Sequence, residues 1–354
     1  RLGAGGVGDV QLARQPALHR DVALKLLKSS GEEHESRLLL REAVVMGYLE
    51  HPNIVPIHVV GQNEQGELVV AMKRVEGQTF ADWIDGGALD RLDKALEVVM
   101  EVCNALAFAH QKGVVHLDIK PTNIMIGRFG EVYLLDWGTA VAFSDAVPEE
   151  LPRPMNDGRV RGTPAYMAPE MVIGAPPLPQ TDVFLLGGLL HAVVTGRGPH
   201  RGGTAYDVLK AAYECAPLVV PDGTPPGLGA IMSRALSREP GDRFASAAQL
   251  RDAISDFSRS RAATAVLASA RGRAAELLAA MHQHKPPHEV YRALGGAREL
   301  MTEAANLAPD SSPAHAELQD LLTEVIRWEL DRGNGAGAER LITELPTPSP
   351  ELAR

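Results

Sequence analysis

The chain has 354 residues, of which 45% are hydrophobic and 23% charged, and its formal net charge is −10. This balance suits a packed globular protein rather than a disordered one, and the length favours two domains, since single cores stop growing near about 250–300 residues. An acidic chain presents no basic surface for a polyanion, so we expect no nucleic-acid partner.

Signals for disulfides, metals and targeting are scarce. Cys103 and Cys215 lie far apart and outside any ligand spacing, so neither a disulfide framework nor a zinc site is expected. The most apolar long window, residues 183–194, is shorter than the roughly 20 residues of a membrane span. No signal peptide is recognisable, and we expect a cytoplasmic protein. Since the sequence begins at Arg1, without methionine and inside a motif, we expect further residues upstream.

Short β-branched runs alternate with turn signals in the first 75 residues, which predicts a small antiparallel sheet. One helix with apolar residues at helical spacing interrupts the strands. Residues 1–75 are therefore expected to form a small β-rich lobe. The predicted strands are 7–12, 22–27, 54–60 and 68–72, and the predicted helix is 32–50.

Helical patterns dominate residues 76–258, which we expect to form a second, larger lobe. Between Ala146 and Gly162, prolines and charges occur without hydrophobic periodicity, so a long exposed loop is predicted there. The predicted helices are 92–111, 181–195, 205–214, 228–236 and 245–257, the last ending in Ser258-Arg259-Ser260-Arg261, and the short predicted strands are 124–126 and 132–135.

Beyond residue 258 the composition shifts toward Ala, Leu and Glu, which predicts an all-α extension over residues 259–345 and a flexible end over 346–354. Residues 304–310 resemble the end of a tetratricopeptide repeat. Two interpretations stay open: a plain helical extension that packs on the preceding domain, and degenerate repeat-type helices that bind a protein partner. The predicted helices are 261–284, 289–308, 312–331 and 336–345.

The chain opens with G-x-G-x-x-G-x-V, a glycine-rich motif whose backbone can approach phosphate oxygens. A dinucleotide-binding fold needs a helix at the third glycine, whereas here strand residues continue and a second strand follows, which favours a kinase. Lys25 ends that second strand, and Glu42 lies on the intervening helix, where it can neutralise Lys25 and direct its ammonium toward phosphates. The motif is formed by Gly3, Gly5, Gly8 and Val10, and Gly6 between them is a further candidate for binding the nucleotide.

The most specific signal is His116-Leu117-Asp118-Ile119-Lys120-Pro121-Thr122-Asn123 followed by Asp136-Trp137-Gly138. These residue types divide the labour of phosphoryl transfer. Asp118 would accept or orient the substrate hydroxyl, and Lys120 would neutralise charge on the moving phosphoryl group. Asn123 and Asp136 would hold metal ions.

In these motifs the sequence resembles the Hanks-type protein kinases, and in particular the bacterial Ser/Thr kinases, over residues 1 to about 258. Ala168-Pro169-Glu170, Asp182 and Arg243 belong to the same resemblance. It implies a bilobal α+β kinase fold, ATP with Mg²⁺ or Mn²⁺ as cofactors, and proteins as substrates. Lys120 together with Thr163 matches the Ser/Thr class.

The resemblance also implies roles for residues outside the catalytic motifs. Glu170 and Arg243 would pair within the large lobe, and Asp182 would brace the catalytic loop. Met72 would be the gatekeeper before the hinge Lys73-Arg74-Val75. The adenine slot would be lined by Val10, Ala23, Met72, Lys73, Val75 and Met125, and a stacked column would join Met46, Ile57, His116 and Trp137.

Two residues depart from the family pattern. Leu117 stands where the family usually has an arginine that binds a phosphate on the activation segment, and residues 145–162 contain no Ser, Thr or Tyr. We therefore expect activation without phosphorylation of this loop. Trp137 replaces the usual phenylalanine, and its indole can still fill the apolar site. Two rival interpretations are a pseudokinase scaffold with a partner-binding helical tail and a small-molecule phosphotransferase.

Overall fold

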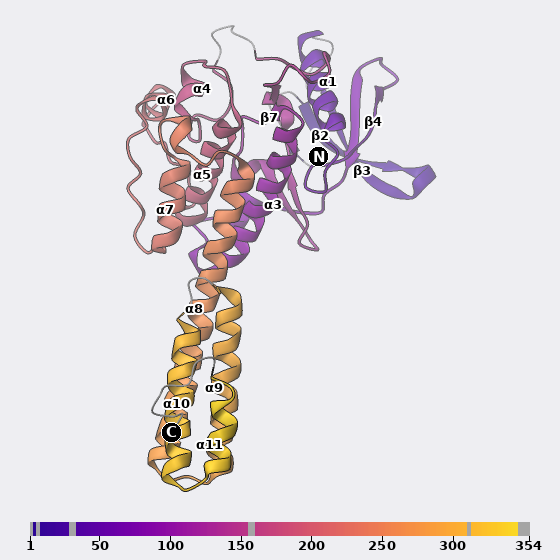
Figure 1. Cartoon of the computed structure of the whole chain (residues 1–354). Coiled ribbons are helices and arrows are strands. Elements are labelled where there is room, and N and C mark those ends of the chain that lie inside the picture. Colours follow the sequence, from indigo (N-terminus) through magenta and orange to yellow (C-terminus); the bar gives the residue numbers. More distant parts are fainter. Residues whose placement is uncertain (1–2, 5–7, 28–32, 155–159, 310–312, 346–354) are drawn as a thin grey trace. The chain divides into compact units, whose positions relative to one another are not determined.

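The computed structural model (Figure 1) describes residues 3–4, 8–27, 33–154, 160–309 and 313–345. Residues Arg1–Ser255 form one compact unit and Asp256–Arg354 form another. The predicted phosphate-loop residues Gly5 and Gly6, and the end predicted to be flexible, lie outside the described residues. In the described part of the chain, no helix combines the length and apolarity of a membrane span.

A five-stranded antiparallel sheet forms the small lobe, with the strand order β1-β2-β3-β5-β4. Helix α1 (Glu33–Tyr48) packs on it through Leu39 and Ala43, which meet Val70 in an apolar cluster. The predicted strand 54–60 begins later, at Ile57, because Pro56 has no N–H to donate to a ladder. The strands are β1 (Gly3–Ala4), β2 (Gly8–Gln15), β3 (Arg20–Leu27), β4 (Ile57–Gln62) and β5 (Leu68–Lys73).

The large lobe is built around α3 (Leu92–Gln111) and α5 (Pro179–Thr195). Helix α5 is apolar on all sides and buried from Thr181 to Val194, as expected of a helix in the centre of a core. The other elements are β6 (Gly77–Thr79), α2 (Phe80–Trp83), β7 (Val114–Val115), β8 (Ile124–Gly127), β9 (Val132–Leu134), β10 (Val141–Ala142), α4 (Pro169–Val172), α6 (Ala205–Glu214) and α7 (Pro226–Ala235).

The segment between β10 and α4 is less exposed than the sequence suggested. Leu151 is only 2% exposed, and the backbone N–H of Ala142 donates to Pro152 O at 2.7 Å. Arg153 donates to the carbonyl of Ser144 at 2.5 Å. The prediction of an exposed loop therefore holds for Ala146 and for residues 148–150 but was wrong for Leu151 and Pro152, which are buried because the chain folds back there onto β10.

The second unit is all helical, with an Ala- and Leu-rich core that includes Leu277, Leu294 and Val325. The break expected at Ser258–Arg261 was wrong, since one helix runs through these residues. Neither serine nor arginine interrupts a helix as glycine or proline does. The helices are α8 (Ala247–His282), α9 (Pro287–Leu307), α10 (Ala314–Asp331) and α11 (Gly335–Ile342).

Candidate active site

The loop that follows β7 is fixed by Asp182, in the first turn of α5. The carboxylate of Asp182 accepts the backbone N–H groups of His116 and Leu117, both at 2.9 Å, and the Nε2–H of His110 at 2.8 Å. Burial opposes ionisation of Asp182, but the hydrogen bonds outweigh it and hold its pKa below the ordinary value. Asp182 thus makes the hydrogen bonds to the backbone of the loop after β7 that the resemblance led us to expect.

Leu117 has a φ of 67°, in the left-handed region that costs a non-glycine residue roughly 1–2 kcal/mol. The hydrogen bond from its N–H to Asp182 and the one from Thr139 Oγ1 to the carbonyl of His116, at 2.9 Å, stabilise this conformation. The strained backbone therefore lies directly before Asp118, where such strain often accompanies function.

Asp118, Lys120 and Thr163 form a closed triangle of hydrogen bonds. Lys120 Nζ donates to Asp118 Oδ2 at 2.7 Å and to Thr163 Oγ1 at 2.6 Å, and Thr163 Oγ1 donates to Asp118 Oδ1 at 2.7 Å. Burial raises the pKa of Asp118, but the bonds from Lys120 and Thr163 outweigh this and lower it overall. The structure thus joins Thr163, 45 residues away in sequence, to the loop carboxylate and keeps that carboxylate ionised.

Asn123 lies beside this triangle, and Asp136 lies near Glu42. The Nδ2 group of Asn123 donates to Asp118 O at 2.8 Å and to Asp118 Oδ2 at 3.1 Å, which leaves its amide oxygen on the other side. Asp136 is exposed and has a φ of 57°. An amide oxygen and a carboxylate are the ligand types that a hard divalent cation prefers, so this pair fits such an ion.

Lys25 and Glu42 form the buried ion pair predicted from their positions. Lys25 Nζ lies 2.6 Å from Glu42 Oε1 and 2.7 Å from Oε2. Burial raises the pKa of Glu42 and Asp136 raises it further, while Lys25 acts in the opposite direction. A Cβ placed on Gly138 would lie 3.2 Å from Asp136 Oδ1 and 3.5 Å from Glu42 Oε2, so a glycine leaves room where these carboxylates approach.

Arg243 and Glu170 form a second buried pair. All five N–H groups of the guanidinium are used: two bind the Glu170 carboxylate, at 2.6 and 2.9 Å, and three bind backbone carbonyls. Those carbonyls belong to Ser237, Gln180 and Arg238. The predicted pair is therefore the centre of a network that anchors α4 to the loop before α8.

The residues expected around adenine lie on neighbouring elements. In the sheet, Ala23 of β3 faces Met72 of β5, and Val10 of β2 faces Lys25 of β3. Met125 lies on β8, opposite Thr79 of β6. Val75 follows β5 and is half-buried.

Trp137 is fully buried, and its ring centroid lies 4.6 Å from that of His116. Met46 is buried, and Ile57 lies beside it around a common cavity. His116 thus contacts Trp137, and Met46 and Ile57 line one cavity; the stacked column of all four residues stays a prediction.

Three contacts of the fold were not predicted from the sequence. His110 bonds to Asp182 and Thr139 bonds to the carbonyl of His116, so both support the loop after β7, although only the fold brings them to it. Lys73 Nζ forms a short hydrogen bond with the hydroxyl of Tyr133 on β9. No sequence spacing connects Lys73 with Tyr133, 60 residues later, so this contact could not be predicted.

A lysine and glutamate paired under a glycine-rich strand, together with an aspartate and asparagine on a braced loop, define a phosphotransferase of the protein kinase class. The protein kinase domain family matches residues 1–252. The chain belongs to this family. Membership implies the use of ATP and a divalent metal ion.

Its relatives include bacterial Ser/Thr protein kinases. The chain is 38% identical over 229 residues to the Ser/Thr-protein kinase PknD of Protochlamydia amoebophila, covering 57% of this chain and 23% of that protein. It is 34% identical over 261 residues to PknB of Mycobacterium tuberculosis, covering 71% of this chain and 41% of that protein. The chain thus spans less than half the length of these relatives.

Proposed function

We propose that this chain transfers the γ-phosphoryl group of Mg-ATP to Ser and Thr hydroxyls of proteins. The observation that carries the proposal is the triangle of Asp118, Lys120 and Thr163. It holds an ionised carboxylate and an ammonium side by side, where one group can receive a hydroxyl proton and the other can stabilise a charged phosphoryl group.

Asp118 orients the substrate hydroxyl and takes its proton as the oxygen attacks phosphorus. A lowered pKa keeps Asp118 ionised at neutral pH, so it is ready to accept. Lys120 stabilises negative charge on the transferred group, and Thr163 keeps both side chains in place. Lys25, aligned by Glu42, binds the α- and β-phosphates.

The proposed metal ion is Mg²⁺, with Mn²⁺ as the alternative. The amide oxygen of Asn123 and the carboxylate of Asp136 would bind it, since Mg²⁺ takes one or two protein oxygens and completes its shell with phosphates and water. When bound, it neutralises charge on the phosphates. The Gly3–Gly8 loop and the slot between Val10, Ala23, Met72, Lys73, Val75 and Met125 would hold the nucleotide.

The test is phosphate transfer from labelled Mg-ATP to a basic Ser/Thr peptide and to the chain itself. Asp118→Asn keeps the shape but removes the base, and we expect the rate to fall about 10²–10⁴-fold. Asp252→Asn, at an exposed position on α8, is the matched control and should transfer normally. If the unaltered chain binds Mg-ATP but transfers nothing, the alternative of a pseudokinase scaffold is favoured.

We further propose that phosphorylation of the activation segment does not control activity. Residues 145–162 offer no hydroxyl, and Leu117 supplies no cation for a phosphate. The buried Leu151 and the hydrogen bonds of Arg153 to the carbonyls of Ser144 and Val147, which need no phosphate, support this proposal. Phosphatase treatment should leave the transfer rate unchanged, whereas loss of activity would contradict the proposal.

For the helices of residues 259–345 we propose a protein partner, as in repeat-type helical modules. Deleting residues 262–354 should leave phosphate transfer to a peptide intact and weaken capture of the physiological substrate. Equal behaviour of the short and long chains toward both would make these helices a passive extension.

A further inference from the structure

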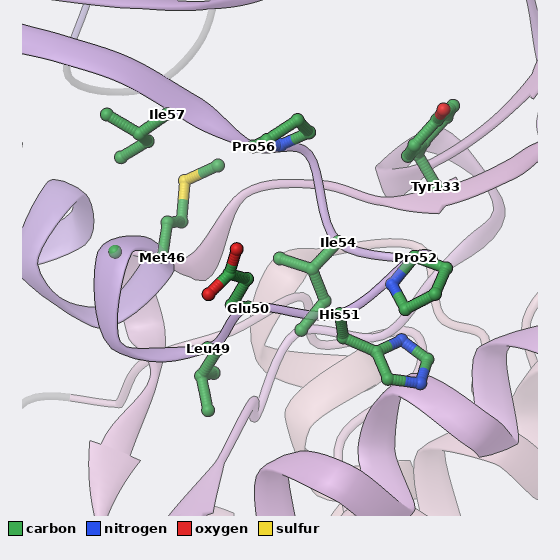
Figure 2. A pocket seen from close by; sticks show the side chains of 10 residues that line it. Met46, Leu49, Glu50, His51, Pro52, Ile54, Pro56, Ile57 and Tyr133 are labelled. Carbon is green, nitrogen blue, oxygen red and sulfur yellow. The ribbon is translucent and has the colours of Figure 1, made fainter.

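A cavity of about 300 Å³ lies at the end of α1, where the chain turns toward β4 and meets β9 (Figure 2). None of the residues proposed to bind the nucleotide, the metal ion or the substrate hydroxyl lines it. Met46 and Ile57, which belong to the predicted stacked column, do line it. Its size lies at the lower end of small-ligand pockets, which span roughly 300–1,000 Å³. It is therefore a separate candidate site.

Backbone hydrogen bonds hold the walls of this cavity in place. Asn53 accepts from Leu134 N at 2.8 Å and donates through Nδ2 to Val132 O at 3.0 Å, which ties the turn after α1 to β9. Pro56 O accepts from Lys73 N at 3.1 Å. Because the walls are ordered before any ligand arrives, binding would cost little conformational entropy in the protein.

Gly47 leaves one edge of the cavity open. It lies inside α1, where a glycine weakens a helix relative to alanine. A Cβ placed on Gly47 would meet no atom within 4 Å, so crowding does not require glycine there. Because Gly47 lines the cavity and the position of its Cβ is open, a larger side chain there has room to occupy part of the cavity.

The lining residues are mainly apolar and carry one charge of their own at neutral pH, which is negative, while the Lys73 ammonium lies at the hydroxyl of one of them, Tyr133. Burial lowers the pKa of His51, and its Nδ1 accepts from Asn53 N, so this imidazole is neutral at pH 7. Glu50 is exposed, forms no ion pair within the described part of the chain, and in Figure 2 its carboxylate lies between Met46 and Ile54. An apolar space beside an unpaired carboxylate complements an apolar cation.

We propose that this cavity binds a small arylalkylamine, with its ring against Met46, Ile54 and Ile57 and its ammonium group beside Glu50. Met46 lies one helical turn after Glu42, so an occupant that packs on Met46 holds α1 where Glu42 meets Lys25. Occupancy then favours the arrangement that binds phosphates. This effect on rate rests on the proposed kinase function, whereas the binding itself does not.

The experiment compares 2-phenylethylamine with phenylacetate, which have similar size and opposite charge, by calorimetry without ATP. The amine should bind at least about 10-fold more tightly than the carboxylate. Glu50→Gln should remove this preference. Gly47→Leu should weaken amine binding about 10-fold or more, while the matched variant Gly47→Ala keeps it, with both variants showing the cooperative unfolding of the unaltered chain.

Equal affinity for the two probes, or amine binding that survives Gly47→Leu, would overturn the site. In the transfer assay the amine should raise kcat/KM about 5-fold or more in the unaltered chain and not in Gly47→Leu. An unchanged kcat/KM despite binding would overturn the coupling to α1. Charge-selective binding in a chain that never transfers phosphate would leave the site standing and reject the kinase function alone.

Discussion

The two compact units differ in what they bury. In Arg1–Ser255 the core contains charged and polar side chains such as Lys25, Asp182 and Arg243, whereas in the described part of Asp256–Arg354 the only one is Glu329. Burying a charge is costly unless it is paired, so removing one partner in the first unit leaves another charge stranded. The second unit is held mainly by Ala and Leu packing and should respond more mildly.

The largest effect is expected on activity. Lys25→Met removes the cation proposed to bind phosphate and leaves Glu42 buried without its partner, so kcat/KM should fall about 10²–10³-fold, as when one preorganised group is lost. The matched control in the second unit is Arg273→Met, which breaks an exposed pair with Glu276 and should change nothing. The peptide transfer assay measures kcat/KM of both variants. Equal losses of kcat/KM would contradict the difference between the two units.

The next effect is on stability. Arg243→Ala strands Glu170 and three carbonyls, and should lower the free energy of unfolding of the first unit by about 3–5 kcal/mol. Arg271→Ala, which breaks the exposed pair with Glu317, should lower the free energy of unfolding far less. Urea unfolding monitored by tryptophan fluorescence measures both. Similar costs would show that burial does not separate the two pairs.

A smaller effect is expected at Glu329, the one buried charged residue among the described residues of the second unit. Asn334 Nδ2 donates to Glu329 Oε2 at 2.6 Å, and Asn334 Oδ1 accepts from Gly337 N at the start of α11. Asn334→Ala removes both contacts and should cost about 1–2 kcal/mol in urea unfolding.

Asn334→Asp keeps the cap but places a second carboxylate beside Glu329, so it should also destabilise the unit. A neutral result for Asn334→Asp would show that capping alone matters and that Glu329 needs no partner.

The smallest effect is a pH dependence in the first unit. Burial lowers the pKa of His200 below its ordinary 6.5, so the unfolded chain binds the proton more tightly. The contribution of neutral His200 to the free energy of unfolding is full above pH 6.5 and decreases as the pH falls toward the lowered pKa of the folded state. His200→Gln keeps a donor for Met167 O but does not titrate, and its unfolding midpoint should decrease less between pH 7 and pH 5. A parallel decrease in both proteins would assign the dependence to other groups.

Local patterns predicted the helices, the strands and the paired motif residues well, because hydrophobic periodicity and residue charge can be read directly from the sequence. Helix α3 has the bounds that its periodicity gives, and Lys25 meets Glu42 as their types suggest. Predictions failed where tertiary contacts decide. A composition change after Phe257 did not end α8, and the burial of Leu151 depends on a fold that loop composition does not encode.

The candidate site divides in the same way. The identities of Asp118, Asn123 and Asp136 follow from motif spacing, but the supporting contacts of His110 and the contact between Lys73 and Tyr133 need the folded chain. The cavity beside Gly47 is a property of three converging segments. No single stretch of sequence carries a signal for it.

The activation segment, which Arg153 folds back, bears on how long this protein would stay active after a stimulus. A loop that receives a phosphate keeps a record of past activation until a phosphatase erases it. Residues 145–162 have no hydroxyl to store such a record, so under the proposed function an activator would act only while it stays bound. The duration of a signal through this protein would then equal the residence time of its activator, without any phosphatase.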